Sequence, residues 1–188
     1  MRNAPAVFIL LAICFAAPSS GAQTETPKVE IYGGYDYVRF NITSNVSGFA
    51  PSESVNLNGG GGQVEYNLNR WLGAVGDFTG YYGTTNGGSG GAFSYLFGPR
   101  VNWRRDRFTP FAQVLLGGFA STSGIATSGL QNHFALAAGG GVDIQVTKLI
   151  AIRPVQAEYF LTTIPDGLNS RQNSFRFSAG VVFRLGKK

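Results

Sequence analysis

The sequence predicts an all-β fold, an eight-stranded antiparallel up-and-down transmembrane β-barrel that follows a cleavable signal peptide. The first observation is the segment 173–188, in which every second residue from Phe175 to Leu185 is apolar. Side chains alternate between the two faces of a strand, so this segment has an apolar face and a face that carries Arg176 and Arg184. The second observation is an export signal. For an exported chain it is favoured that the apolar face contacts lipid and that the other face lines a polar lumen. The third is the composition.

The export signal occupies residues 1–22. Arg2 supplies a positive start, residues 7–17 form a short apolar stretch, and small residues follow at 20–22, as a signal peptidase requires. A membrane-spanning helix needs roughly 17–25 apolar residues, so this stretch is too short to span. We expect residues 23–188 to form the mature barrel domain.

The only cysteine, Cys14, lies within the expected signal peptide. Its removal would leave the mature domain without a disulfide, a thiolate nucleophile or a cysteine-based metal site.

Composition separates the chain from soluble enzymes. Charged residues make up 13% of it, against about 25% in typical domains. Glycine, at 27 of 188 residues, is about twice as frequent as its usual ~7%, and aromatic residues reach 13%. The net charge of +5 comes from dispersed Lys and Arg residues, so no basic run indicates nucleic-acid binding. We assign the positive excess to turns and loops that could meet anionic lipid headgroups.

Strand-like segments recur along the mature chain. They cover 28–40, 57–68, 71–83, 92–104, 108–120, 132–146, 149–163 and 173–186. The connections at 67–70, 104–107 and 147–148 are short and polar, whereas those at 41–56, 84–91, 121–131 and 164–172 are longer. Short turns at one end and long loops at the other are expected of an outer-membrane barrel.

Strict alternation places apolar residues towards lipid and polar residues in the lumen for every segment except the seventh. There Arg153, Gln156 and Glu158 stand at odd spacing. A β-bulge near Pro154 would return all three to the lumen, because proline cannot donate to the strand ladder. The alternative is that Arg153 or Gln156 lies near a rim.

Ten charged residues are predicted to face the lumen. They are Glu30, Asp36, Glu65, Asp77, Arg100, Asp143, Arg153, Glu158, Arg176 and Arg184. An eight-stranded barrel is only wide enough for side chains to fill it, and unpaired buried charges are costly. These residues are therefore interpreted as a structural salt-bridge network, and the alternative is a polar path for ions or a catalytic carboxylate.

Aromatic residues are predicted to form two interfacial belts. Trp71, Trp103, Phe108 and Phe183 lie near the short turns, and Tyr82, Phe93, Phe119, Phe160 and Phe175 lie towards the long loops. A general preference of aromatic residues for strands is the other explanation. The glycine runs 59–62 and 139–141 lack the following helix of a phosphate-binding loop and are interpreted as relief of crowding.

The mature chain resembles the small outer-membrane β-barrel family of the OmpA/OmpX type, or porin family. The specific element is Ser178, Gly180, Phe183 and Leu185, which is similar to the polar-x-Gly-x-x-aromatic-x-hydrophobic assembly signal of that family. The family usually ends on an aromatic residue, whereas here Gly186-Lys187-Lys188 follows Leu185. The resemblance implies a Gram-negative cell envelope, location in the outer membrane, and contacts with its lipid, its assembly machinery and periplasmic chaperones.

The predicted function is a non-enzymatic, structural or surface-interaction role: envelope integrity, adhesion or limited solute passage, with an unknown extracellular partner. We expect no catalytic, cofactor-binding or metal residues. One alternative is a lipid-modifying enzyme, for which His133 with Ser123 or Ser128 is the available set. The other is a secreted lipocalin-like carrier of an apolar ligand, which would turn the apolar face inwards.

Overall fold

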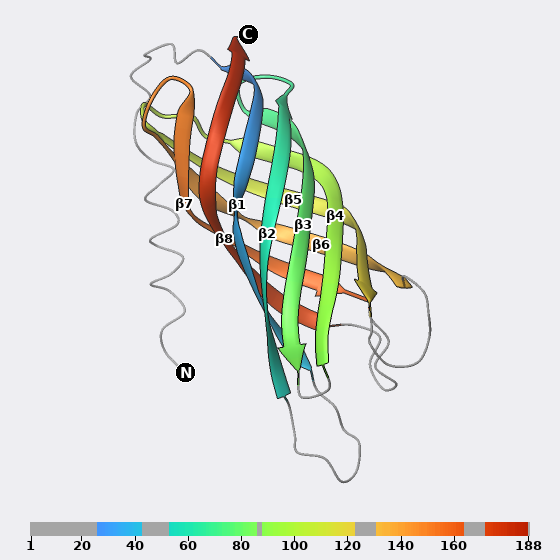
Figure 1. Ribbon diagram of the computed structural model, residues 1–188. Coiled ribbons are helices and arrows are strands. Elements are labelled where there is room, and N and C mark those ends of the chain that lie inside the picture. The colour runs from blue at the N-terminus through green and yellow to red at the C-terminus, as the bar shows by residue number, and fades with distance from the viewer. Residues whose placement is uncertain (1–25, 43–52, 86–87, 123–130, 164–171, 188) are drawn as a thin grey trace, which may run out of the picture.

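The computed structural model describes residues 26–42, 53–85, 88–122, 131–163 and 172–187. Eight antiparallel strands follow one another around a closed barrel, which β1 and β8 close by pairing with each other (Figure 1). The strands are β1 (Pro27–Ile42), β2 (Glu53–Asn67), β3 (Leu72–Thr85), β4 (Gly88–Asn102), β5 (Phe108–Thr122), β6 (Gln131–Gln145), β7 (Ile150–Thr162) and β8 (Gln172–Lys187). The predicted fold class is confirmed, and in this part of the chain no helix is long and apolar enough to cross a membrane.

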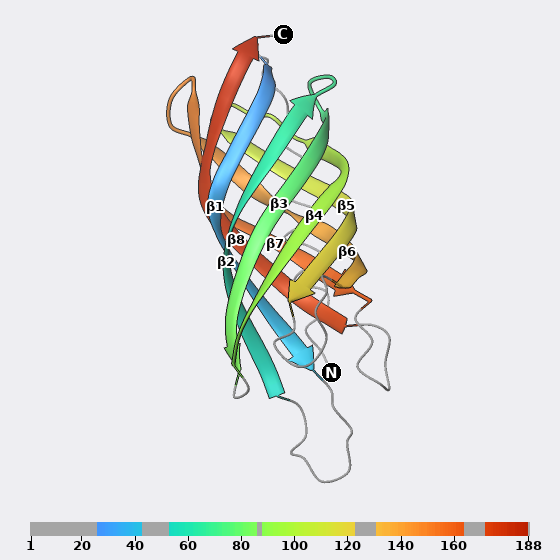
Figure 2. The same cartoon turned by 45° about the vertical axis from the view of Figure 1, so that its right-hand side comes forward.

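Three short turns, at 68–71, 103–107 and 146–149, lie at one end of the barrel with the start of β1 and the end of β8 (Figures 1 and 2). We call this the turn end, and the opposite end the loop end. Side chains hold two of the turns: Asn69 Oδ1 accepts hydrogen bonds from the amides of Trp71 and Leu72, and Thr147 Oγ1 from those of Leu149 and Ile150. Asn and Ser/Thr residues favour turns through such bonds.

The predicted loop at 84–91 is wrong, because most of it belongs to strands. Pairing between β3 and β4 continues to Thr85 and Gly88, so only residues 86–87 connect them. Those residues are Asn-Gly, the dipeptide most favoured between two hairpin strands. A run of small polar residues read as a loop from its composition is here paired backbone.

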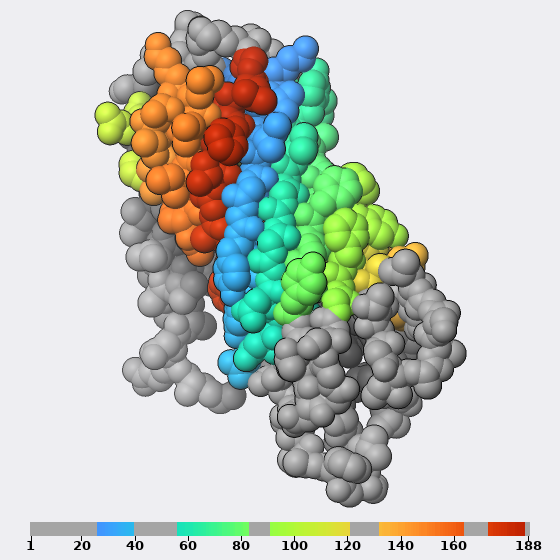
Figure 3. All heavy atoms as spheres, in the orientation of Figure 1, coloured from blue at the N-terminus to red at the C-terminus, as the bar shows by residue number. Residues whose placement is uncertain are grey.

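Burial alternates along the strands as predicted. Glu30, Tyr32 and Asp36 of β1 are buried, whereas the intervening Ile31 and Tyr35 are exposed on the outer face. The same alternation puts Arg176 and Arg184 of β8 inside and Phe175, Phe177 and Phe183 outside. Strands β7, β8, β1 and β2 lie side by side across one outer face in Figure 3. The lipocalin-like alternative is therefore wrong, since the charged face of the sheet is the inner one.

The predicted bulge in β7 is confirmed. Register against β8 shifts between Arg153 and Gln156, and register against β6 shifts between Val142 and Ile144. Pro154 and Val155 both lie on the outer face, so Arg153, Gln156 and Glu158 are all buried in the lumen. The alternative that Arg153 or Gln156 sits near a rim is wrong.

Two members of the predicted loop-end belt are not on the outer face. Phe119 and Phe160 point into the lumen and are 2% and 0% exposed. Phe119 is an even number of residues from the inward-facing Gln113 on β5, and Phe160 from Glu158 on β7, so each shares the inner face of its strand. Grouping aromatic residues by their height along the barrel ignores this alternation. The other belt residues are exposed: Trp71, Trp103, Phe108 and Phe183, and Tyr82, Phe93 and Phe175.

Candidate functional site: the barrel lumen

The lumen contains three layers of side chains along the barrel axis. A rim layer at the turn end contains Glu30, Asn67, Arg104 and Arg184. A central layer combines three arginines with four carboxylates and several amides. It consists of Gln63, Glu65, Asp77, Arg100, Asn102, Gln113, Asp143, Arg153, Gln156, Glu158 and Arg176. An apolar layer lies towards the loop end, made of Val38, Val75, Tyr81, Leu96, Leu115, Phe119, Ala135, Ala137 and Phe160.

Arg100 on β4 joins three strands in the central layer, because its partners lie on β2 and β5. Its Nη1 donates to Glu65 Oε2 at 2.9 Å, and its Nε donates to Gln113 Oε1 at 2.7 Å. Its Nη2 also donates to Gln63, and its guanidinium lies over the ring of Phe111 at 4.3 Å from the centroid. Glu65 additionally accepts from Asn102 Nδ2 at 2.5 Å. The charge of Arg100 is thus matched by one carboxylate and dispersed over amides and an aromatic face.

Arg153 is held by a two-point ion pair. Its Nε and Nη2 donate to the two oxygens of Asp143 at 2.7 and 3.0 Å. Its Nη1 donates to Gln63 and Gln156, at 2.7 Å each. The guanidinium also lies against the rings of Tyr32 and Phe111, 4.5 and 4.4 Å from their centroids. The bulge in β7 places Arg153 and Gln156 where both reach this position.

Arg176 serves two carboxylates. Its Nη1 and Nη2 donate to Asp77 at 3.1 and 3.0 Å, and its Nε donates to Glu158 Oε2 at 2.7 Å. The five donors of a guanidinium fork allow this double pairing, which a lysine could not reproduce. Gln63 Nε2 donates to Asp77, and Gln113 Nε2 donates to Glu158. These two glutamines link the three arginines into one network.

The rim layer contains an arginine that the sequence analysis missed. The sequence predicts Arg104 in a turn, but it is buried and its Nη1 donates to Glu30 Oε1 at 2.8 Å, while Nη2 donates to Asn67. Arg184 approaches the same Glu30 oxygen at 3.4 Å and donates to Gln145. Arg104 follows Arg100 and Asn102 at every second position of the same segment, and this alternation could have predicted that it faces the lumen.

Asp36 is the one predicted network residue outside these ion pairs. It is buried and accepts a hydrogen bond from Ser178 Oγ, and none of the ion pairs between described residues includes it. The other nine predicted residues all belong to ion pairs of the rim or central layer.

Inward glycines make room for the large lumen side chains. A Cβ atom on Gly73 would lie within 3 Å of the Glu65 side chain, and one on Gly141 would meet the Phe111 ring at 2.9 Å. One on Gly180 would meet the Tyr32 ring at 2.8 Å. Interpreting glycine runs as relief of crowding is thus supported at Gly141 by a specific neighbour.

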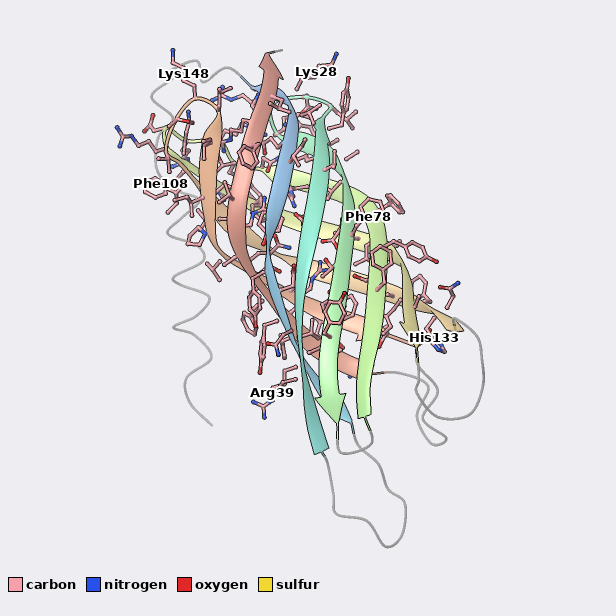
Figure 4. The ribbon with its side chains drawn as sticks, viewed as in Figure 1. Lys28, Arg39, Phe78, Phe108, His133 and Lys148 are labelled. Carbon is pink, nitrogen blue, oxygen red and sulfur yellow. The ribbon has the colours of Figure 1, made fainter. Side chains whose placement is uncertain are left out.

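The arrangement favours packing over catalysis. The central carboxylates accept hydrogen bonds from arginines that are themselves fully engaged. His133 lies at the loop end of β6 in Figure 4 and is half-buried, and both Ser123 and Ser128 lie outside the described residues. Within the described ranges, no group of His, Cys, Asp and Glu side chains could hold a metal ion.

The predicted assembly-signal residues occupy both faces of β8. Phe183 and Leu185 are exposed on the outer face, whereas Ser178 is buried against Asp36 and Gly180 lies opposite Gly34 on β1. The predicted signal peptide lies outside the described residues.

Comparison with known proteins agrees with this geometry. The family described as "Outer membrane protein beta-barrel domain" matches residues 6–183. None of the curated proteins matches the sequence.

Three solved structures share the fold. The Neisserial surface protein A is 16% identical with a TM-score of 0.63, over 84% of this chain and 97% of that one. The attachment invasion locus protein Ail of Yersinia pestis is 16% identical with a TM-score of 0.54, over 85% and 99%. The outer membrane protein OprG of Pseudomonas aeruginosa is 12% identical with a TM-score of 0.54, over 86% and 97%. At these identities the likeness establishes the fold alone.

Proposed function

The chain belongs to the outer membrane protein beta-barrel domain family and is an outer-membrane protein, and from this premise we propose that it is a non-enzymatic membrane component that presents a surface for interaction outside the cell. The observation that carries the proposal is the filled lumen. Side chains from every strand occupy it, from the Glu30 ion pairs at the turn end to Phe119 and Phe160 towards the loop end. Such a barrel serves as a closed support for its loops rather than as a wide pore.

The loop end of the barrel supports a surface role. Strands of 13 to 16 residues exceed the roughly 9–11 residues that a tilted strand needs to cross the bilayer. The outer face of the β1–β2 hairpin becomes polar there, with Arg39, Asn56 and Asn58 exposed. Tyr35 and Tyr37 donate their hydroxyl hydrogens to Asn58 and Asn56 at 2.5 and 2.9 Å. We therefore expect the paired end of this hairpin to project beyond the lipid.

Of the finer roles, contact with a surface or another molecule is favoured over solute passage, because passage would require the central arginines to leave their carboxylates. One structural neighbour, Ail, is itself named an attachment invasion locus protein. At 16% identity the likeness to Ail supports a shared fold but not a shared role. The proposal therefore depends on the projecting hairpin and the filled lumen.

We also propose that β8 is read by the outer-membrane assembly machinery and its periplasmic chaperones. Phe183 and Leu185 stand exposed on the outer face of the last strand. A machinery that binds this strand before the barrel closes could contact both side chains directly.

Conductance across planar lipid bilayers tests the closed lumen. The folded protein is expected to give no steady open-channel current, because the buried, hydrogen-bonded side chains of the central layer occupy the lumen. A constant, wide conductance from the purified barrel would overturn the proposal.

Cysteine labelling of intact cells tests the surface role. Asn56→Cys is expected to react with a membrane-impermeant maleimide, whereas Arg70→Cys at the turn end should react only after the outer membrane is permeabilised. The reverse pattern would place the turn end outside and contradict the proposal. If Cys14 is removed with the signal peptide, the introduced thiol is the only one in the mature chain.

A further inference from the structure

Exposed cations are concentrated at the turn end. Lys28 on β1, Arg70 in the β2–β3 turn, Arg105 and Arg107 in the β4–β5 turn and Lys148 in the β6–β7 turn are all exposed. We call these five residues the basic collar. Figure 4 shows Lys28 and Lys148 at this end, with their ammonium groups directed away from the barrel. Asp106 is the one exposed acidic residue that accompanies them among the described residues.

The side chains of the basic collar form no ion pair within the described part of the chain. The ion pairs there all lie in the lumen, where the arginines of the rim and central layers meet buried carboxylates. The neighbouring Arg104 is buried against Glu30 and takes no part in the collar. The positive charge of the collar is therefore available to a partner outside the protein.

Each collar turn also carries an exposed apolar or aromatic side chain. Arg70 precedes Trp71, Arg107 precedes Phe108, and Lys148 precedes Leu149, with exposures of 56%, 54% and 63% for the three apolar residues. Trp103 lies two residues before Arg105 and is 40% exposed. Aromatic side chains lie at the headgroup level of a membrane, so the adjacent cations reach the same level.

The β4–β5 turn holds its two arginines on a fixed support. The amide of Arg105 donates to the carbonyl of Phe108 at 2.9 Å, and the amide of Phe108 donates back at 2.7 Å. Asp106 adopts a positive φ of 39°, which Asp tolerates in tight turns. Arg105 and Arg107 therefore flank the tip of a closed hairpin.

Charge is distributed unequally between the two ends. The four segments that connect strands at the loop end, 43–52, 86–87, 123–130 and 164–171, contain only Asp166 and Arg171 as charged residues. The positive excess of the chain therefore belongs to the turn end, which faces the periplasm in barrels of this type.

From this geometry we propose that the basic collar binds the phosphate groups of anionic phospholipids in the periplasmic leaflet of the outer membrane. Each Lys or Arg near an anionic lipid surface is attracted to it, and the attraction weakens within a Debye length. The collar surrounds the barrel, so it would gather several headgroups while Trp71, Trp103 and Phe108 pack beside them. This contact fixes the depth of the barrel independently of what its loops bind.

Fluorescence quenching by brominated lipids tests the proposal directly. Trp71 and Trp103 are the only tryptophans in the chain and both adjoin the collar. The protein is folded into vesicles that contain equal mole fractions of either brominated phosphatidylglycerol or brominated phosphatidylcholine. We expect the apparent association with the anionic lipid to be at least about threefold stronger, and the preference to shrink in high salt.

Two variants separate the collar from general charge. Substitution of all five collar residues by Gln should abolish the preference for anionic lipid. Substitution of Arg105 and Arg107 alone by Gln should weaken it. Arg39→Gln, an exposed cation at the loop end, is the matched control and should leave it unchanged. The heat-dependent gel shift of each variant verifies that the barrel has folded, and the double variant keeps the test valid if the fivefold variant does not fold.

Equal quenching by the two lipids in the wild-type protein would overturn the proposal, as would a preference that survives the fivefold substitution. A wild-type protein that binds soluble poly-glutamate but shows no lipid preference would identify an acidic soluble partner instead, and would overturn it too.

Discussion

Buried arginines contribute differently from exposed ones to the stability of this barrel. Arg100, Arg153 and Arg176 are each at most 1% exposed, and each makes at least four polar contacts. Removal of one leaves carboxylates without a counter-charge in a space that water cannot easily refill. Exposed Arg39 takes part in none of the ion pairs between described residues. Stability should therefore respond very differently to substitutions of similar chemistry.

Arg176→Met should lower the free energy of unfolding by about 3–5 kcal/mol, because Asp77 and Glu158 would both lose their partner. Urea titration of the protein in lipid vesicles, followed by tryptophan fluorescence, measures this change. Arg39→Met is the control and should change the value by less than about 1 kcal/mol. Equal effects of the two substitutions would show that the lumen network does not stabilise the barrel.

Gly73→Ala should destabilise the barrel by about 1–3 kcal/mol, a typical cost of overpacking. The new Cβ would lie 2.9 Å from Cγ and Cδ of Glu65, which Arg100 and Asn102 hold in place. Gly33→Ala is the matched control on the outer face, where no atom lies within 4 Å of the added carbon. The same urea titration compares them, and a stable Gly73→Ala protein would mean that Glu65 can move freely.

Single strands show how far sequence reasoning reaches. Alternation assigned Glu30, Asp77 and Arg176 to the lumen, and the proline in β7 identified the bulge, because both depend on local backbone geometry. Alternation does not predict which lumen side chains contact each other. Arg153 meets Gln63, 90 residues away, and such a contact depends on the register of all eight strands. Alternation assigns a face but not a height.

The same limit explains the errors. The sequence predicts Arg104 in a turn although its parity points inwards, because composition does not locate the end of β4. Grouping by height alone predicts Phe119 and Phe160 in a belt, whereas they pack in the apolar layer. Residues near the ends of strands and residues grouped by height are where a sequence pattern carries the least information.

Along β8, a charge on the outer face should cost more at mid-membrane than near the end of the strand. Val181→Arg is expected to destabilise the barrel by roughly 2–4 kcal/mol, and Asn173→Arg, exposed at the loop end of the same face, by roughly 0–1 kcal/mol. Folding yield and urea stability in vesicles provide the measurement. Equal cost at both positions would contradict the lipid-facing assignment of this face.

The assembly role proposed for β8 can be separated from its packing. Phe183→Ala should reduce the amount of barrel in the outer membrane of cells more than Phe177→Ala, although both side chains are similarly exposed, at 48% and 46%. In detergent the two variants should refold alike, because neither side chain packs in the lumen. Equal membrane levels in cells would remove Phe183 from the proposed signal.

The whole molecule combines an apolar exterior with a charged interior. Outward residues such as Val64, Phe97, Val114 and Val181 surround the barrel, with exposed aromatic residues towards both ends and the basic collar at the turn end. Inside, the central layer joins all three arginines into one network. Because charged side chains are inside and apolar side chains outside, we expect the outer face to require lipid or detergent around it.

Electrophoretic mobility of the membrane-fraction protein, with and without boiling in SDS, shows whether the chain forms a closed barrel in the membrane. The unboiled protein should run as a compact species, the boiled protein should run as an unfolded chain, and the protein should remain in the membrane pellet after alkaline carbonate extraction. A protein with the same mobility before and after boiling, released by carbonate, would not be a membrane barrel.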